Sequence, residues 1–366
     1  MKHFTKLYSC FFIGMVAAGC SKEHSANLDT QYQSADTVTR FINPLKKSAI
    51  DPYVTQKDGY YYYMSTGANY LTLTRAKEMI FLDQAYSKTI FTPPAGAAYN
   101  TNISKPEIHF LIGKWYVYFS ADNGQAINRR TYVIENSAAD PLTGTWEFKG
   151  KIADAANDLL ATDGTVLEYN GQLYFLWSGF NQLPTSVTRI EQQLFISKMK
   201  DPYTLDGERV SISQPTNSWE SYETIINKVV YRYLLNQNPE VIKNGAGDVF
   251  LTYTAGSCES DNVSLGLLSL KTGTDPMVAS NWVKSAQPVF ATSRDAYGPA
   301  FNGFFKSADG KEDWIIYNAN PLPGQGCINA RSPRIQKFSW KPDGSPDFGI
   351  PVGTSLAADS LLRPSK

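Results

Sequence analysis

One pattern of apolar and polar positions returns five times along the chain, at intervals of roughly 50 to 75 residues. Each copy has a start marked by Pro or a small residue, a short apolar run, a turn that contains Gly, and a strand rich in Tyr, Trp and Phe. The copies begin at Asp51, Lys105, Asp163, Asn238 and Gly298. Strand–turn–strand units repeated at this period are typical of a β-propeller.

Helical periodicity is nearly absent, so we predict an all-β chain that forms a five-bladed β-propeller. The blades are expected at residues 40–95, 100–152, 158–213, 236–290 and 295–355. The first strand of each blade should line the axis, so the five copies should converge on one pocket. The stretch 215–235 does not follow the rhythm. It is expected to be a long loop over the axial face, with a blade-edge strand as the alternative.

The first 20 residues have the features of a targeting segment. Lys2 and Lys6 precede an apolar stretch, and small residues lead into Cys20 in a manner similar to a bacterial lipobox. We predict a lipoprotein signal peptide over 1–20, a lipid anchor at Cys20, a flexible tether over 21–38 and the propeller over 39–358. The protein would then be held on a bacterial membrane, at a periplasmic or cell-surface location. An ordinary signal peptide is the alternative.

Composition supports a large core, with 42% hydrophobic and 13% aromatic residues. The formal net charge is zero and basic residues form no stripe, which argues against nucleic acid as a partner. With Cys20 lipidated, Cys258 and Cys327 are left to form one disulfide in an oxidising compartment. The chain has three histidines, too few for a histidine-rich metal site.

Two copies of the repeat open on a carboxylate at the same phase, Asp51 and Asp163. Each is followed by a turn-forming residue, and such a dipeptide is more often a turn than a site. The shared phase, however, predicts that both side chains point toward the axis. Paired carboxyl groups are the usual means of cutting glycosidic bonds.

Longer strings carry a specific likeness. They are NPLKKSAIDPYV, PEIHF with IGKWYVYFSAD, YVIENSAADPLTGTWEFKGKI, TDGTVLEYNGQLYFLWSG, NPEVIKNG and RSPRIQKFSWKPDGSPDFG. Through them the chain from about Phe41 to Val352 resembles glycoside hydrolase family 43, whose members are inverting arabinofuranosidases, arabinanases and xylosidases on five-bladed propellers. The strings look most like the secreted α-L-arabinofuranosidase branch.

The resemblance implies a role for each polar position. Asp51 matches the general base that activates water, and Asp163 matches the aspartate that raises the pKa of the acid and orients it. The family's acid is a glutamate in a Glu-Gly-Pro segment after an Asn. Here the chain reads Asn236-Gln237-Asn238-Pro239, so Gln237 occupies the position of the general acid. An amide cannot donate a proton to the leaving oxygen.

Further departures lie around the same pocket. Phe301 stands where relatives carry an axial histidine that often supports a bound ion. Ser104-Lys105 stands where Trp-Ala commonly precedes Pro-Glu, which removes an aromatic platform for sugar stacking. The resemblance implies no cofactor, and an axial calcium or sodium ion is the one metal that it leaves open.

Three glutamates are the candidates for a substitute acid: Glu220 and Glu223 in the stretch 215–235, and Glu240, three residues after Gln237. Each could instead be a solvated surface residue. Trp219, Phe180, Phe301 and Arg334 are the candidates for substrate binding, and a blade-closing ion pair is the alternative for Arg334.

The leading interpretation is inverting hydrolysis of α-L-arabinofuranosyl or related pentosyl linkages in plant polysaccharides or oligosaccharides. The alternative is a glycan-binding propeller that retains the sugar pocket but is impaired in catalysis. A third reading is a substrate whose leaving group needs no protonation.

Overall fold

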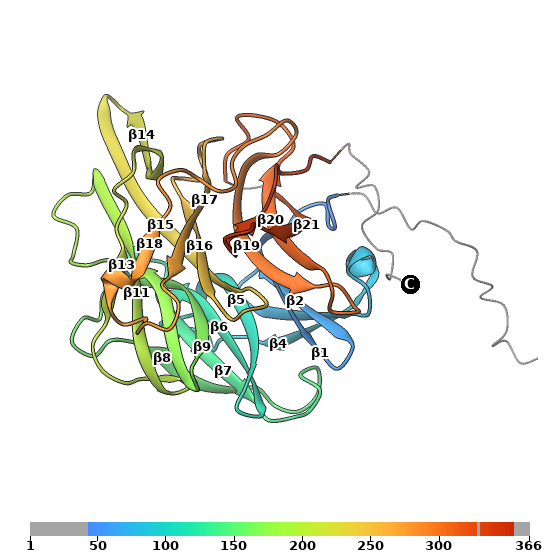
Figure 1. Cartoon of the computed structure of the whole chain (residues 1–366). Coiled ribbons are helices and arrows are strands. Elements are labelled where there is room, and N and C mark those ends of the chain that lie inside the picture. The colour runs from blue at the N-terminus through green and yellow to red at the C-terminus, as the bar shows by residue number, and fades with distance from the viewer. Residues whose placement is uncertain (1–42, 328–329, 355–366) are drawn as a thin grey trace, which may run out of the picture. The chain divides into compact units, whose positions relative to one another are not determined.

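Antiparallel strands follow one another along the whole described chain, which comprises residues 43–327 and 330–354 of a computed structural model (Figure 1). These residues lie within one unit, Thr39–Lys366. The expectations for residues 1–20, for Cys20 and for the tether over 21–38 lie outside the described residues. Among the residues described, no helix has the length and apolar character needed to span a membrane.

The first two blades are each a four-stranded antiparallel sheet. Blade one contains β1 (Ile50–Lys57), β2 (Tyr60–Thr66), β3 (Leu71–Ala76) and β4 (Tyr86–Phe91). Blade two contains β5 (Thr101–Leu111), β6 (Lys114–Asp122), β7 (Arg130–Asn136) and β8 (Glu147–Ile152). Short 3-10 helices occur at Met79–Gln84 and Ala126–Asn128.

The other three blades follow the same plan. Blade three contains β9 (Ala161–Tyr169), β10 (Gln172–Gly179), β11 (Arg189–Asp201), β12 (Thr204–Leu205) and β13 (Val210–Ser213). Blade four contains β15 (Val229–Lys243), β16 (Val249–Ala255), β17 (Ser264–Leu270) and β18 (Trp282–Lys284). A 3-10 turn at Ala279–Asn281 directly precedes β18. Blade five contains β19 (Tyr297–Lys306), β20 (Asp313–Asn320), β21 (Ser332–Trp340) and β22 (Pro346–Asp347).

The innermost strands form a closed ring. Strand β1 contacts β5, β5 contacts β9, β9 contacts β15, β15 contacts β19, and β19 returns to contact β1. The residues just before β1 strengthen this closure, because the side chain of Asn43 exchanges two hydrogen bonds with the backbone of Ile335 in blade five, each 3.0 Å long. The predicted all-β, five-bladed propeller is confirmed.

Five apolar clusters fill the molecule, one between each pair of neighbouring blades. A blade is therefore covered on both faces, and successive side chains of a strand point to opposite faces. This explains why the central strands have nearly continuous apolar runs instead of alternation. In β6, for example, every residue after Lys114 is buried, and Trp115 and Phe119 are fully excluded from solvent.

The stretch 215–235 is not a loop over the axial face, so that expectation is wrong. It contains a 3-10 turn at Ser218–Glu220 and β14 (Ser221–Ile226), which pairs antiparallel with the extended first half of β15. Strand β15 also pairs in parallel with β11 over Arg232–Leu235, so blades three and four share hydrogen bonds. The β14–β15 hairpin extends beyond the blades in the upper left of Figure 1.

Candidate active site

Every inner strand has the same irregularity at the same place. At this place a non-glycine residue adopts a left-handed conformation, and the pairing register shifts around it. These residues are Asp51 (φ 53°), Lys105 (φ 48°), Asp163 (φ 57°), Asn238 (φ 53°) and Phe301 (φ 52°). Left-handed non-glycine residues cost about 1–3 kcal/mol each and cluster at functional sites. A bulge re-aims a side chain, so the fivefold repeat becomes five side chains directed toward the axis.

Three of these residues, Asp51, Asp163 and Phe301, line a cavity of about 320 Å³. Its walls come from all five blades: Ile50, Asp51, Ser104, Ala126, Arg129, Leu160, Thr162, Asp163, Gln192, Gln237, Cys258, Phe301 and Cys327. A larger cavity, of about 540 Å³, lies between blades one and five and is lined by residues such as Tyr61 and Phe305. It contains none of the five bulge residues, so we take the smaller, axial cavity as the candidate site.

Asp51 is held in place from three directions. Its backbone N–H donates to Asn318 Oδ1 at 2.8 Å. Its Oδ2 accepts hydrogen bonds from the Thr66 hydroxyl, at 2.5 Å, and from the backbone N–H of Lys105, at 3.2 Å. The side chain is buried but reaches the cavity. A carboxylate restrained in this way can act on a water molecule without first reorganising.

Asp163 is restrained by other donors. Its Oδ1 accepts from the Thr162 hydroxyl at 2.7 Å, and its Oδ2 accepts from the backbone N–H of Asn238 at 3.3 Å. Burial raises the pKa of Asp163 above its ordinary value, and the charge of Asp51 raises it further. The following residue must be glycine, because a Cβ on Gly164 would lie 2.1 Å from the ring of Phe175.

Gln237 lines the same cavity and is fixed by a second glutamine. Its Nε2 donates to Gln192 Oε1 at 2.6 Å, and the Ser178 hydroxyl lies 3.1 Å from that same oxygen. Asp51 and Asp163 are therefore the carboxyl groups of the cavity among the described residues. The structure brings together the three residues that the sequence assigns to base, modulator and acid position.

Glu220 does not line the cavity. It is fully buried, and its Oε1 contacts Lys284 Nζ at 2.6 Å, Tyr253 Oη at 2.8 Å and Asn236 Nδ2 at 2.9 Å. Its Oε2 accepts from the backbone N–H of Asn217, which completes a capping box. A carboxylate with this set of donors supports Asn236, the neighbour of Gln237, and has no path to a substrate.

Glu223 and Glu240 also lie outside the cavity. Glu223 is half exposed on the β14–β15 hairpin, where it forms an ion pair with Arg232. Glu240 is buried beneath the cavity and lies 2.5 Å from Lys105 Nζ. The structure therefore places none of the three candidate acids at the pocket.

Of the residues expected to bind substrate, Phe301 alone lines the cavity. Arg334 is completely buried in blade five and donates to the backbone carbonyls of Asp295, Val352 and Ala319. It does not line the cavity, and the charge of Asp295 acts on its guanidinium. Trp219 packs beside Tyr253 and donates to Ala286 O, and Phe180 is buried. The cavity walls do not include either residue.

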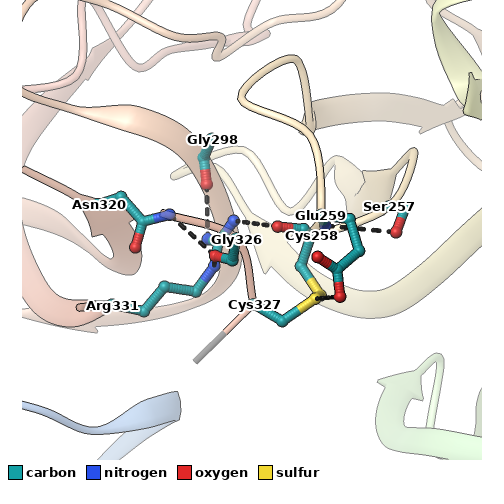
Figure 2. The surroundings of a disulfide bond; sticks show 8 residues. All are labelled: Ser257, Cys258, Glu259, Gly298, Asn320, Gly326, Cys327 and Arg331. Atoms are coloured by element: carbon teal, nitrogen blue, oxygen red, sulfur yellow. Dashed lines mark hydrogen bonds between the residues drawn. A yellow bond between two sulfur atoms is a disulfide. The ribbon is translucent and has the colours of Figure 1, made fainter. Parts of the chain in front are cut away.

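The cavity wall includes a disulfide between Cys258 and Cys327, whose Cα atoms are 4.7 Å apart. It joins the β16–β17 loop to the β20–β21 loop. Figure 2 shows that the buried Arg331 ties the same loops together. Its guanidinium donates to Gly298 O at 2.7 Å, Gly326 O at 3.3 Å and Cys258 O at 3.4 Å. The disulfide that the sequence left open is present, and it has a place in the pocket that the sequence did not reveal.

Gln192 and Arg129 were also missed from the sequence. Gln192 lies in β11, the third strand of its blade, whereas the repeat directs attention to first strands. Arg129 follows a short 3-10 helix and donates to Asp122 Oδ2 at 3.0 Å. The feature that could have identified Gln192 is the parallel pairing of β11 with β15, which brings Gln192 beside Gln237. Sequence patterns do not specify such inter-blade pairing.

The sequence left open a calcium or sodium ion on the axis. The described residues include no group of three His, Cys, Asp or Glu arranged to hold a metal. The centre of the ring is instead occupied by the ammonium group of Lys105, which lies between Glu240 and Glu107. Phe301 supplies an apolar ring where a ligand would be needed.

Comparison with known proteins identifies the class. Residues 41–346 match the glycosyl hydrolases family 43, and the chain belongs to this family. An extracellular exo-α-(1→5)-L-arabinofuranosidase of Streptomyces avermitilis is 40% identical over 326 residues, which are 86% of this chain and 64% of that protein. Alpha-L-arabinofuranosidase 43 of Humicola insolens is 32% identical over 332 residues, 87% of this chain and 65% of that protein. This chain thus spans slightly less than two thirds of these relatives.

Solved structures agree with this assignment. An α-L-arabinofuranosidase from Lactobacillus brevis is similar with a TM-score of 0.76 at 30% identity, over 86% of this chain and 98% of that chain. A thermostable family-43 glycoside hydrolase is similar with a TM-score of 0.71 at 20% identity, over 88% and 100% of the two chains. The second likeness supports the fold alone.

Proposed function

We propose that the protein is an inverting glycosidase for α-L-arabinofuranosyl or related pentosyl linkages of plant polysaccharides, with Asp51 as the base and Asp163 as the modulator. The observation that carries the proposal is the pair of restrained carboxyl groups in one axial cavity. A pocket that only binds sugar has no need of two aspartates held in left-handed conformations. The identity of the sugar is inferred from the relatives, which are named arabinofuranosidases.

In the proposed reaction Asp51 accepts a proton from a water molecule as the water oxygen attacks the anomeric carbon. The bond to the leaving oxygen breaks on the opposite face, and the sugar is released with inverted configuration. Gln237 cannot protonate the leaving oxygen. General acid catalysis typically contributes about 10²–10⁴-fold in rate, so leaving groups that are stable as anions should be favoured.

The test is a series of aryl and alkyl α-L-arabinofuranosides whose leaving groups differ in acidity. We expect 4-nitrophenyl and more acidic phenyl glycosides to turn over, and alkyl glycosides or arabinobiose to react at least about 10²-fold more slowly. Asp51→Asn should abolish turnover of every substrate. Equal rates across the series would mean that an acid is supplied after all, and an absence of turnover for all substrates would contradict the enzyme assignment.

A second candidate function is glycan binding without turnover, which the amide at Gln237 and its hydrogen bond to Gln192 favour. Calorimetry with arabino-oligosaccharides separates the two. Micromolar binding with no product from any aryl glycoside would support the binding function.

We also propose that Cys20 anchors the protein by a lipid to a bacterial membrane, at a periplasmic or cell-surface location. The basic and apolar residues that precede Cys20 support this, and the relatives from two Streptomyces species are named extracellular. Expression with a labelled fatty acid tests it. Label should be present in the full-length protein, and Cys20→Ala should remove it and release the protein from the membrane fraction.

A further inference from the structure

A salt bridge crosses the centre of the propeller beneath the sugar pocket. Lys105 belongs to β5 in the second blade, and Glu240 belongs to β15 in the fourth. The inner strands form the ring β1–β5–β9–β15–β19, in which β5 and β15 are not neighbours. Since Lys105 Nζ lies 2.5 Å from Glu240 Oε1, the contact must pass through the middle of the ring.

The ammonium and its partners are shielded from water. The side chain of Lys105 is 1% exposed, that of Glu107 0% and that of Glu240 3%. Lys105 Nζ also lies 3.3 Å from Glu107 Oε1, so one cation serves two carboxyl groups. A buried charge is tolerated only when it is paired. The cluster therefore has to retain a cation at this point.

Further side chains surround the carboxyl groups that Lys105 contacts. Glu107 Oε2 lies 3.1 Å from His109 Nε2, and His109 Nδ1 lies 3.4 Å from the hydroxyl of Tyr53 on β1. The fifth-blade position is Phe301, which has no polar atom in its side chain.

Lys105 is also hydrogen-bonded to the candidate active site. The backbone N–H of Lys105 donates to Asp51 Oδ2 at 3.2 Å and to the Thr66 hydroxyl at 2.9 Å. Lys105 thus holds Asp51 through its backbone and neutralises the axis through its side chain. A metal ion would have to displace the ammonium to reach Glu107 and Glu240.

We propose that the ammonium group of Lys105 is the built-in axial cation of this propeller. It occupies the place that a bound metal would take, so the pocket forms without metal. Removing the Lys105 side chain would open a site for a divalent cation between Glu107 and Glu240. The proposal concerns the architecture of the pocket and does not depend on turnover.

The first test uses the full-length wild-type protein. Its Tm is measured after dialysis against EDTA in sodium-free buffer, and again with calcium chloride or sodium chloride at matched ionic strength. A ligand that binds the native state raises Tm. We expect the three values to agree within about 1 °C. The proposal would be overturned if either ion raised the Tm of the wild-type protein by more than this and the rise were absent in Glu240→Gln. No Lys105 variant is needed for this outcome.

The second test compares Lys105→Ala with Lys105→Met. Both remove the charge, but methionine refills the space whereas alanine leaves it open. In EDTA both should melt about 5–15 °C below wild type, because two buried carboxyl groups lose their partner. Calcium should restore at least half of the loss in Lys105→Ala and almost none in Lys105→Met.

A double variant, Lys105→Ala with Glu240→Gln, is the control and should lose the calcium response. Equal responses of the alanine and methionine variants would contradict the proposal. If neither variant folds, the wild-type measurements still decide, because a metal requirement would be visible there. Loss of glycosidase activity in any variant bears on the proposed function and not on this inference, because Tm is the measured quantity.

Discussion

Gln237 and Gln192 are joined by a hydrogen bond of 2.6 Å from the Nε2 of the first to the Oε1 of the second. The two residues come from different blades, and β15 brings them together by pairing in parallel with β11. Gln192 presents an oxygen toward position 237. Either an amide N–H or a protonated carboxyl group at position 237 can donate a hydrogen bond to this oxygen. The position is therefore compatible with the acid that the family pattern expects there.

Gln237→Glu should restore proton donation. We expect the rate on alkyl arabinofuranosides or arabinobiose to rise about 10²–10⁴-fold, with a much smaller change on 4-nitrophenyl arabinofuranoside. The dependence of rate on leaving-group acidity should flatten, which is the decisive readout. Gln192→Glu, a matched change on the other side of the hydrogen bond, is the control and should give no such gain. An unchanged dependence in Gln237→Glu would mean that more than the acid has been lost.

Glu220 should be important for stability and not for proton transfer. Its carboxylate accepts from Lys284, Tyr253 and Asn236 while fully buried. Glu220→Gln should lower the free energy of unfolding by about 1–3 kcal/mol, because a charged partner is removed from the partly buried Lys284. Its rate on 4-nitrophenyl arabinofuranoside should stay within about threefold of wild type.

The matched control is Glu223→Gln, on the exposed hairpin, where an ion pair is worth about 0–1 kcal/mol. Urea unfolding and initial rates distinguish the two positions. A normal stability for Glu220→Gln together with lost turnover would identify Glu220 as the missing acid.

The disulfide should stabilise the fold and shape the pocket together. Cys258 and Cys327 are 69 residues apart, and closing a loop of that length contributes about 4 kcal/mol in the chain-entropy treatment. The double variant Cys258→Ser with Cys327→Ser should lose about 2–4 kcal/mol of unfolding free energy. Because both residues line the cavity, arabino-oligosaccharide affinity should also fall.

Arg331→Lys provides a comparison that leaves the disulfide intact. Lysine cannot reproduce the three divergent hydrogen bonds to Gly298, Gly326 and Cys258. It should weaken binding by loosening the same loops. Unchanged affinity in both variants, measured by calorimetry, would show that this rim does not contact the sugar.

The sequence specifies the blades well because each one is a local unit. Strands such as β6 and β10 are recognisable from their aromatic runs, and a repeat places its members at equivalent positions. Asp51 and Asp163 were found in this way. Glu220 and Arg334 were misplaced for the opposite reason. The partners of Glu220 lie in other strands, Lys284 in β18 and Tyr253 in β16, and no local pattern shows that a glutamate in an irregular stretch is enclosed by them.

Lys105 is another residue whose contacts could not be predicted from the local sequence. In the sequence, Ser104-Lys105 replaces the Trp-Ala that commonly precedes Pro-Glu, and the change indicates the loss of an aromatic platform for the sugar. The structure shows that Lys105 gains Glu240, 135 residues away, across the axis. Contacts through the centre of a propeller join non-adjacent repeats, so the period that reveals the blades does not reveal what meets on the axis.

His109, whose side chain is 12% exposed, should make the fold less stable in mild acid. Burial lowers the pKa of His109 to about 4, from an ordinary value near 6.5. Between these two values the unfolded chain takes up a proton that the folded protein does not. Stability is therefore unaffected above about pH 6.5 and falls as the pH is lowered toward 4. From pH 7 to pH 5 the contribution of His109 amounts to a loss of about 2 kcal/mol.

His109→Gln retains a polar side chain and cannot titrate, so the loss between pH 7 and pH 5 should be smaller by about that amount than in wild type. The comparison is made between the two proteins, because burial also raises the pKa of the neighbouring Glu107 and Glu240, and raised carboxyl pKa values act in the opposite direction. Guanidinium unfolding at both pH values gives the four free energies. A parallel decline in the two proteins would show that His109 titrates normally in the folded state, and that burial does not hold it neutral.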